Sequence, residues 1–242
     1  MRAMIFAAGL GTRLKPLTDT MPKALVPLAG KPLLQWQVEK LRDAGITDIV
    51  VNVHHFPDQI IEAVRANNGW GADIRISDER DRLLDTGGGL KKIYNSQCTM
   101  HHPPTPVLAC NVDILSNIDI KALVAQYEKT GISQLVVSDR QTQRYLCFDA
   151  NDRLCGWTNV STGELKGTDG RHLAFSGMQI LSPEVLRLLR ESKEDKFPLI
   201  SFYLEIMHRT ELRAYVPENY RMMDVGKIDQ IEEAEAFAES LQ

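Results

Sequence analysis

The sequence contains few of the features that stabilise small secreted proteins or anchor proteins in membranes. Only four of its 242 residues are cysteine, and no two of them have the C-x-x-C spacing of a zinc knuckle or a thioredoxin-like site. We therefore expect free thiols in a reducing compartment, which favours the cytoplasm. No apolar run approaches the roughly 20 residues that span a bilayer, so no membrane segment is expected.

Excess positive charge is also absent. The formal net charge is −4, whereas a general nucleic-acid-binding protein usually has a basic face and a high pI. No nucleic-acid partner is therefore expected. With 43% hydrophobic and 25% charged residues, the composition is that of an ordinary globular protein. A chain of this length buries a sizeable core, so it needs neither a disulfide nor a metal merely to fold.

Two familiar glycine-rich phosphate motifs are missing. Gly9 and Gly11 follow an apolar run, but the dinucleotide fingerprint GxGxxG requires a third glycine where the chain has Leu14. A nicotinamide-dependent oxidoreductase would also have an acidic residue at the end of the second strand, where the chain has His54. The Walker string GxxxxGK[ST] does not occur. These absences argue against a nicotinamide-dependent oxidoreductase and against a P-loop nucleotide site.

The first half of the chain alternates between apolar runs and segments of helical periodicity. Leu34, Val38 and Leu41, for example, recur at helical spacing between a proline and a glycine. Such alternation predicts right-handed βαβ units and a parallel sheet covered on both faces. The expected strands cover residues 1–9, 48–54, 73–79 and 106–115, and the expected helices cover 32–45, 57–65, 86–94 and 118–129.

The pattern is less regular after residue 130. A hairpin over 145–157 is expected to turn at Asn151 and Asp152, and Ser182 with the following proline is typical of a helix start. We predict one doubly wound, mostly parallel, Rossmann-like α/β domain over 1–242 with an elaborated C-terminal half. The remaining expected strands cover 132–139, 172–181, 212–218 and 220–226, and a last helix covers 230–241.

The loop after the first strand combines glycines with cations. Gly9 and Gly11 allow backbone N–H groups to turn inward and form a nest for an anion, at the sheet edge where α/β proteins bind ligands. Arg13 and Lys23 follow, the first with a planar fork that matches phosphate oxygens and the second with a compact charge. Three prolines stiffen this segment. The loop therefore predicts a site for a phosphate-rich ligand.

The stretch AAGLGTRLKPLTDTMPKALVPLAGKP at 7–32 resembles the N-terminal signature of the sugar-1-phosphate nucleotidyltransferases, AAGxGTRLxPLTxxxPKxLxPxxxKP. The strings DTGGG at 85–89, NVD at 111–113, FSGMQIL at 175–181 and MMDVG at 222–226 extend the resemblance over essentially the whole chain. Within the family, the chain is most similar to short bacterial enzymes that act on N-acetylmuramate 1-phosphate or mannose 1-phosphate.

The resemblance implies an enzyme that joins a nucleoside triphosphate to a sugar 1-phosphate, making a nucleotide sugar and releasing pyrophosphate. It implies a nucleotide-binding half over 1–130 and a sugar-binding half over 131–242. UTP with N-acetylmuramate 1-phosphate is the leading pair, because DTGGG and FSG most resemble that subgroup, and GTP with mannose 1-phosphate is the alternative. The chain has one helix after MMDVG, so the left-handed β-helix of bifunctional relatives is not expected. A monomer and a dimer both remain open.

The resemblance also assigns roles to single residues. Arg13 would brace the leaving pyrophosphate, and Lys23 would neutralise the phosphates around the reacting centre. Asp113 and Asp224 would hold Mg²⁺, an ion that oxygen ligands bind. The remaining residues that it implicates are Ala7, Ala8, Gly9, Gly11 and Thr12 around the triphosphate, Gly87 and Gly88 against the base and ribose, and Asn111, Asn159 and Gly177 around the sugar.

The chain departs from the family pattern at three places, and at one of them Phe175, Ser176 and Gly177 replace the common NAG triplet. Val112 stands where the family usually has a glycine before the first aspartate. No lysine aligns with the EKP-type string that meets the sugar phosphate in many relatives, and the corresponding region is GWTN, with Trp157 and Asn159. A non-catalytic, nucleotide-sensing subunit is a further alternative. It would be favoured by loss of the arginine, the lysine or either aspartate, and all four are present.

Overall fold

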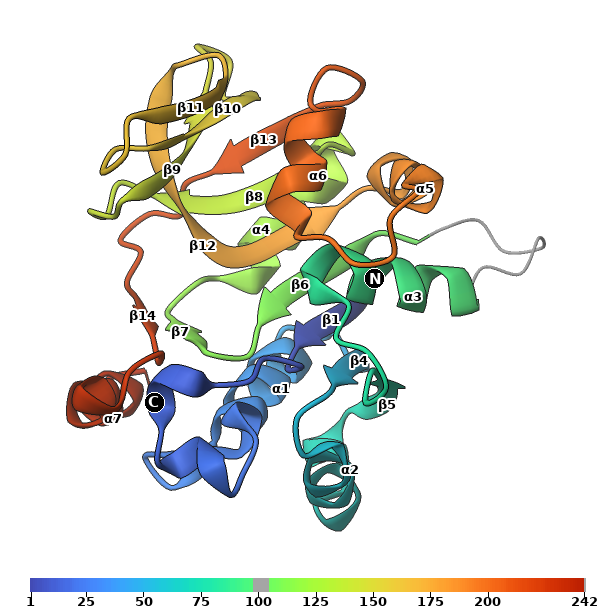
Figure 1. Ribbon diagram of the computed structural model, residues 1–242, viewed down its shortest axis with the longest axis vertical. Helices are drawn as coiled ribbons and strands as arrows, with labels where there is room; N and C mark the ends of the chain where they lie inside the picture. Colours follow the sequence, from blue (N-terminus) through green and yellow to red (C-terminus); the bar gives the residue numbers. More distant parts are fainter. Residues whose placement is uncertain (98–104, 242) are drawn as a thin grey trace.

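The computed structural model describes residues 1–97 and 105–241 (Figure 1). The first half forms the parallel part of a ten-stranded sheet, in the order β6-β1-β4-β5. Apolar runs form the strands, and amphipathic segments form the helices between them, as the periodicity predicts. These elements are β1 (Arg2–Phe6), α1 (Leu33–Asp43), β4 (Asp48–Val53), α2 (Pro57–Ala66), β5 (Asp73–Asp78), α3 (Asp85–Gln97), β6 (Val107–Asn111) and α4 (Ile120–Thr130).

The second half extends the same sheet mostly with antiparallel pairs, and β13 pairs parallel with β8 at the edge. The long strand β12 pairs with β6 on one side and with β8 and β9 on the other. The expected hairpin is confirmed as β9 and β10, and β11 continues it. The strand β11 and the helix α6 were not predicted. The elements are β8 (Ser133–Ser138), β9 (Arg144–Phe148), β10 (Leu154–Asn159), β11 (Glu164–Gly167), β12 (Arg171–Leu181), α5 (Pro183–Glu191), α6 (Leu199–Ile206) and β13 (Leu212–Tyr215).

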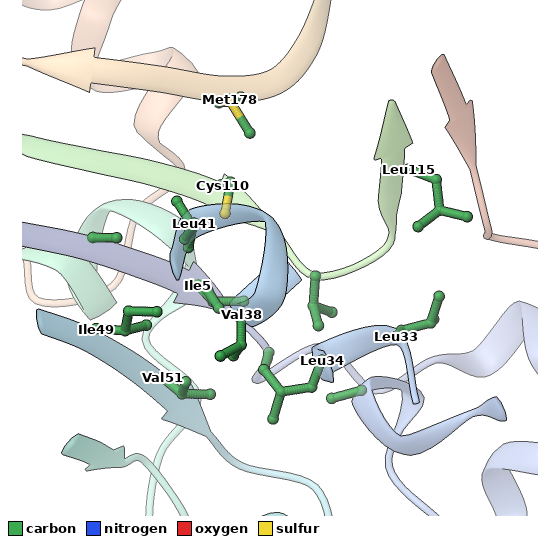
Figure 2. Packing of buried hydrophobic residues seen from close by; sticks show 14 of the residues in the cluster. Ile5, Leu33, Leu34, Val38, Leu41, Ile49, Val51, Cys110, Leu115 and Met178 are labelled. Carbon is green, nitrogen blue, oxygen red and sulfur yellow. The ribbon is translucent and has the colours of Figure 1, made fainter. Parts of the chain in front are cut away.

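Buried side chains cover both faces of the sheet, because successive strand residues point to opposite sides. Figure 2 shows Ile5, Ile49 and Val51 on the face that packs against Val38 and Leu41 of α1. Met4, next to the first of these in β1, belongs instead to the cluster under α3, α5 and α6. The mixed sheet with helices on both faces confirms the predicted α/β class.

The predicted strand over 106–115 is wrong in one respect, because the structure divides it. The strand β6 ends at Asn111, and the separate strand β7 (Ile114–Ser116) pairs antiparallel with β14 (Met222–Asp224). Asp113 lies in the turn between β6 and β7. The apolar run is continuous in sequence, and the pairing with a strand more than 100 residues away decides where it breaks.

Short elements complete the chain. Three 3₁₀ turns, η1 (Thr12–Leu14), η2 (Leu17–Asp19) and η3 (Lys23–Leu25), shape the loop after β1, and β2 (Pro27–Leu28) pairs with β3 (Lys31–Pro32). The last helix is α7 (Ile231–Glu239). Of the cysteines, Cys98 lies outside the described residues, and the other three are free. Among the helices that the structure describes, none has the length and hydrophobicity needed to cross a membrane.

Candidate active site

The loop after β1 folds into a compact turn at the carboxyl edge of the sheet. Gly11 has a φ of 65°, which favours glycine, and a Cβ there would lie 2.8 Å from Cγ2 of Thr18. The Thr18 hydroxyl donates to the carbonyl oxygen of Gly11 at 2.8 Å and fixes the turn. Thr12 and Arg13 then form an exposed 3₁₀ turn. The glycine at position 11 is therefore required by the loop itself.

A cleft of about 390 Å³ opens beside this loop, at the carboxyl ends of β1 and β6. A Cβ on Gly9 would have no neighbour within 4 Å, so this residue borders open space. The cleft also includes residues for which no role was predicted, among them Asn52, Thr86 and Lys196. The predicted site residues that line it are Ala7, Ala8, Gly9, Lys23, Asn111 and Asp113.

Lys23 and Asp113 form an ion pair inside the cleft. The Lys23 ammonium donates to Oδ2 of Asp113, and the side chains are 9% and 20% exposed. The two residues come from different elements, the 3₁₀ turn η3 and the turn after β6. A nearly buried cation held by a carboxylate is kept in place without a ligand, so the positive charge is pre-positioned at the sheet edge.

The pairing of β7 with β14 brings the second aspartate to the first. The backbone N–H of Val225 donates to the carbonyl oxygen of Asp113 at 2.9 Å, and Asp224 is opposite Ile114 in the ladder. Asp224 stays accessible to solvent. Partial burial of its carboxyl and the negative charge of Asp113 raise the pKa of this group, and the cations Lys23 and Arg13 lower it by less. The two carboxylates thus act on each other across a separation of more than 100 residues.

Arg13 lies close to the second carboxylate of this pair. A Cβ on Gly226 would lie 2.9 Å from Nη2 of Arg13 and 2.8 Å from Oδ1 of Asp224. Glycine at this position therefore leaves room for the guanidinium beside the carboxylate. The structure brings Arg13, Lys23, Asp113 and Asp224 into one group of two cations and two anions.

A buried network under the cleft was missed in the sequence. Asn52, at the end of β4, accepts from the backbone N–H of Ala7 at 2.8 Å and donates to Oε1 of Glu79 at 2.9 Å. Oε2 of the same glutamate accepts from the N–H of Leu84 at 3.1 Å. The network ties the loop after β1 to the segment before α3. A polar residue at the end of the apolar strand DIVVNV was the available signal.

The second glycine segment has a role that the resemblance did not imply. The N–H groups of Gly87 and Gly88 both donate to the carbonyl oxygen of Phe197, at 2.8 and 3.3 Å. A Cβ on Gly88 would lie 2.0 Å from the carbonyl oxygen of Asp195. The expectation that these glycines also face a base and ribose stays a prediction. They admit the chain's own segment 195–197, which covers the start of α3.

The three residues expected around the sugar lie in different places. Gly177 has a φ of 71° in the irregular part of β12, and a Cβ there would lie 3.0 Å from Nδ2 of Asn111. These two are thus neighbours at the edge of the cleft. Asn159 is not: its side-chain oxygen accepts from the N–H and hydroxyl of Ser161, at 3.1 and 2.7 Å, and holds the turn after β10. Asn159 thus has a structural role in this turn, and its expected sugar contact stays a prediction.

The whole chain matches one protein family. The sequence profile of the nucleotidyl transferases aligns with residues 2–240. The chain belongs to the nucleotidyl transferase family. The matched residues include the glycine turn after β1 and both aspartates.

Relatives that are named for an enzymatic activity align with different shares of the chain. The N-acetylmuramate alpha-1-phosphate uridylyltransferase of Caulobacter vibrioides is 50% identical over 76% of this chain and 76% of its own length. The protein of the same name from Neisseria meningitidis is 41% identical over 50% of this chain. The aligned part covers about half of that relative, 51% of its length. A mannose-1-phosphate guanyltransferase of Yarrowia lipolytica is 33% identical, with 94% of this chain and 61% of that protein covered.

Solved structures share the fold at lower identity. A UDP-glucose pyrophosphorylase complexed with UDP-glucose superposes with a TM-score of 0.78 at 17% identity, covering 100% of both chains. A putative glucose-1-phosphate thymidylyltransferase from Bacillus anthracis reaches 0.82, also at 17% identity, over 98% of this chain and 95% of that one. These likenesses confirm the fold.

Proposed function

We propose that this protein transfers a nucleotidyl group from a nucleoside triphosphate to a sugar 1-phosphate and releases pyrophosphate. The observation that carries the proposal is the meeting of Arg13, Lys23, Asp113 and Asp224 at the carboxyl edge of the sheet, in a member of this family. Both substrates are polyanions, so the reaction needs charge neutralisation and in-line positioning more than it needs a covalent intermediate.

The proposed step needs no covalent intermediate on the enzyme. A phosphate oxygen of the sugar 1-phosphate attacks the α-phosphorus of the triphosphate, and the bond from that phosphorus to the β-phosphate bridging oxygen breaks. The electron pair leaves with pyrophosphate. Lys23 would place its charge beside the attacked phosphate, and Arg13 would stabilise the charge that develops on pyrophosphate. The loop at Ala8 and Gly9 would let the triphosphate approach the backbone closely.

The carboxylates suit a magnesium ion. Asp113 and Asp224 offer hard oxygen ligands from two paired strands, and their mutual repulsion would be relieved by a divalent cation. Because Lys23 takes Oδ2 of Asp113, the other oxygen of this carboxylate is left for the ion. When bound, Mg²⁺ would polarise the phosphoryl oxygens and neutralise part of their charge.

The leading substrates are UTP and N-acetylmuramate 1-phosphate, since the relatives from Caulobacter vibrioides and Neisseria meningitidis are named N-acetylmuramate alpha-1-phosphate uridylyltransferases. GTP with mannose 1-phosphate is the second candidate, supported by the guanyltransferase relative. We propose that the reaction takes place in the cytoplasm, because the three described cysteines are free thiols. The oligomeric state is either monomer or dimer.

The test is pyrophosphate release over a grid of four nucleoside triphosphates and several sugar 1-phosphates, with and without Mg²⁺. Sugar-dependent and magnesium-dependent release with one triphosphate supports the proposal and names both substrates. We expect Asp113→Asn to lower this turnover by more than ~100-fold with an unchanged circular dichroism spectrum. Binding of a triphosphate without release over the whole grid would instead favour the nucleotide-sensing alternative.

A further inference from the structure

A second hollow of about 420 Å³ lies between the hairpin β9–β10, the bend of β12 and the start of α6. Three cationic side chains line it, those of Arg140, Arg144 and Lys166, and none of the described residues that line it is acidic. Tyr145 and Trp157 add aromatic walls. A hollow with several cations, aromatic faces and no carboxylate of its own is complementary to an anion on an organic ring.

The two arginines are unpaired in the described part of the chain. Neither Arg140 nor Arg144 has a carboxylate oxygen within the 4.0 Å of an ion pair there, and Arg140 donates only to the carbonyl oxygen of Phe175, at 3.1 Å. Lys166 differs, because it pairs with Glu164 at 3.3 Å and lies 5.4 Å from the ring centre of Trp157. Arg140 and Arg144 are therefore the side chains of the hollow that can bind a negatively charged ligand.

The hollow and the cleft are lined by neighbouring residues of the same two segments. Phe175 lines the hollow, and Gly177, two residues further along β12, lies against Asn111 at the edge of the cleft. In the second segment, Lys196 lines the cleft and Pro198 lines the hollow. The charge of Arg140 in the hollow also acts on the Asp224 carboxylate, so the hollow lies within electrostatic range of the carboxylate pair.

We propose that Arg140 and Arg144 bind a carboxylate on the sugar ring and thereby select an acidic sugar 1-phosphate over its neutral counterpart. This inference rests on the proposed function. N-acetylmuramate differs from N-acetylglucosamine by a lactyl ether that carries one carboxylate. An arginine fork matches a carboxylate with two parallel hydrogen bonds, and a neutral hydroxyl at that place would leave the guanidinium without its charged partner.

Arg144 is the cleaner position to test. The charge of Arg140 also acts on Asp224, whose carboxyl pKa it lowers against the larger effect of burial, so its removal would disturb the carboxylate pair as well. We would measure kcat and KM with UTP for N-acetylmuramate 1-phosphate and N-acetylglucosamine 1-phosphate. The variants are Arg144→Gln, Arg144→Lys and, as matched control, Arg65→Gln on the exposed face of α2.

We expect the native enzyme to prefer the acidic sugar. Arg144→Gln should lower the ratio of kcat/KM for the acidic over the neutral sugar by about 10- to 100-fold, which is the loss of one hydrogen bond to a charged group. The change should lie mainly in KM for the acidic sugar, and Arg144→Lys should keep part of the ratio. No native preference, or an equal fall with both sugars, would overturn the inference, the latter because it would assign the arginine to the sugar phosphate.

A binding experiment separates this inference from the proposed reaction. Free N-acetylmuramate, without phosphate, should show saturation transfer in ligand-observed NMR with the native protein, and Arg144→Gln should remove most of it. N-acetylglucosamine serves as the neutral probe. Selective binding without any turnover would retain the acidic subsite and overturn the proposed reaction. Turnover without a preference for the carboxylate would support the proposed reaction and overturn the acidic subsite.

Discussion

Removing the side chain of Asn52 should destabilise the fold far more than an exposed asparagine of the same chemistry. This side chain is 2% exposed and holds two partners, the N–H of Ala7 and the carboxylate of Glu79. Asn52→Ala leaves both partners buried without it. Each buried group that loses its hydrogen bond costs about 1–3 kcal/mol, so we expect a loss of about 3 kcal/mol in the free energy of unfolding.

The assay is urea unfolding followed by circular dichroism. With an m-value of roughly 2 kcal/mol per M, the midpoint of Asn52→Ala should fall by ~1.5 M. Asn67→Ala is the matched control, because Asn67 is exposed and its side chain donates one hydrogen bond, to the carbonyl oxygen of Ala63 at 2.8 Å. Its midpoint should change by less than ~0.5 M. Equal shifts for the two variants would refute the network as a stabilising element.

The variant Asn52→Asp adds a test with pH. It keeps an acceptor for the N–H of Ala7. It also places a second carboxylate beside that of Glu79, because in the native protein the amide nitrogen of Asn52 lies 2.9 Å from Oε1 of Glu79. Two carboxylates that share a site raise the pKa of the pair above the unfolded value. The folded variant then binds more protons than the unfolded chain, so its stability rises as the pH falls. The gap to the native protein should narrow from pH 8 to pH 5, and a constant gap would contradict this placement.

Three further predictions concern the loop, the glycine segment and a partly buried lysine. Arg13→Ala should lower kcat by about 10²- to 10³-fold in the pyrophosphate assay, and a rise in KM alone would make it a ground-state contact instead. Gly88→Ala should lower the midpoint of thermal unfolding by ~5 °C, since its Cβ would meet the carbonyl oxygen of Asp195 at 2.0 Å, whereas Gly9→Ala, with open space around it, should leave the midpoint nearly unchanged. Burial lowers the pKa of Lys40 to about 8 from 10.5, so the folded chain binds fewer protons than the unfolded chain in that window. The native protein should therefore gain up to ~3 kcal/mol over Lys40→Met as the pH rises from 8 to 10.5, measured by urea unfolding, and parallel pH profiles would disprove the effect.

Much of the fold could be predicted because its signals are local. The apolar run of β1, the amphipathic spacing of α1 and the serine cap of α5 each lie within one element, and the structure contains all three. The hydroxyl of Ser182 accepts from the N–H of Val185 at 3.4 Å, as a capping residue should. The strand β11 was missed because all four of its residues are exposed and it has no apolar alternation.

The site could be predicted in its residue types but not in its arrangement. A cation beside a glycine turn indicates an anionic ligand wherever the turn lies, so Arg13 and Lys23 could be chosen from their neighbours in sequence. Lys196 has no such signal in its own segment. It lines the cleft only because the segment after α5 folds back over the start of α3.

The alternation of strands and helices and the glycine turn after the first strand follow from local sequence, because periodicity and backbone freedom are properties of neighbouring residues. Which distant residues meet depends instead on how the elements pack together. The pairing of β7 with β14 brought Asp224 to Asp113, Phe197 occupied the N–H groups of the second glycine segment, and the irregular part of β12 placed Gly177 against Asn111 at the edge of the cleft. Each of these depends on hydrogen bonds and packing between elements far apart in the chain, which no local pattern encodes.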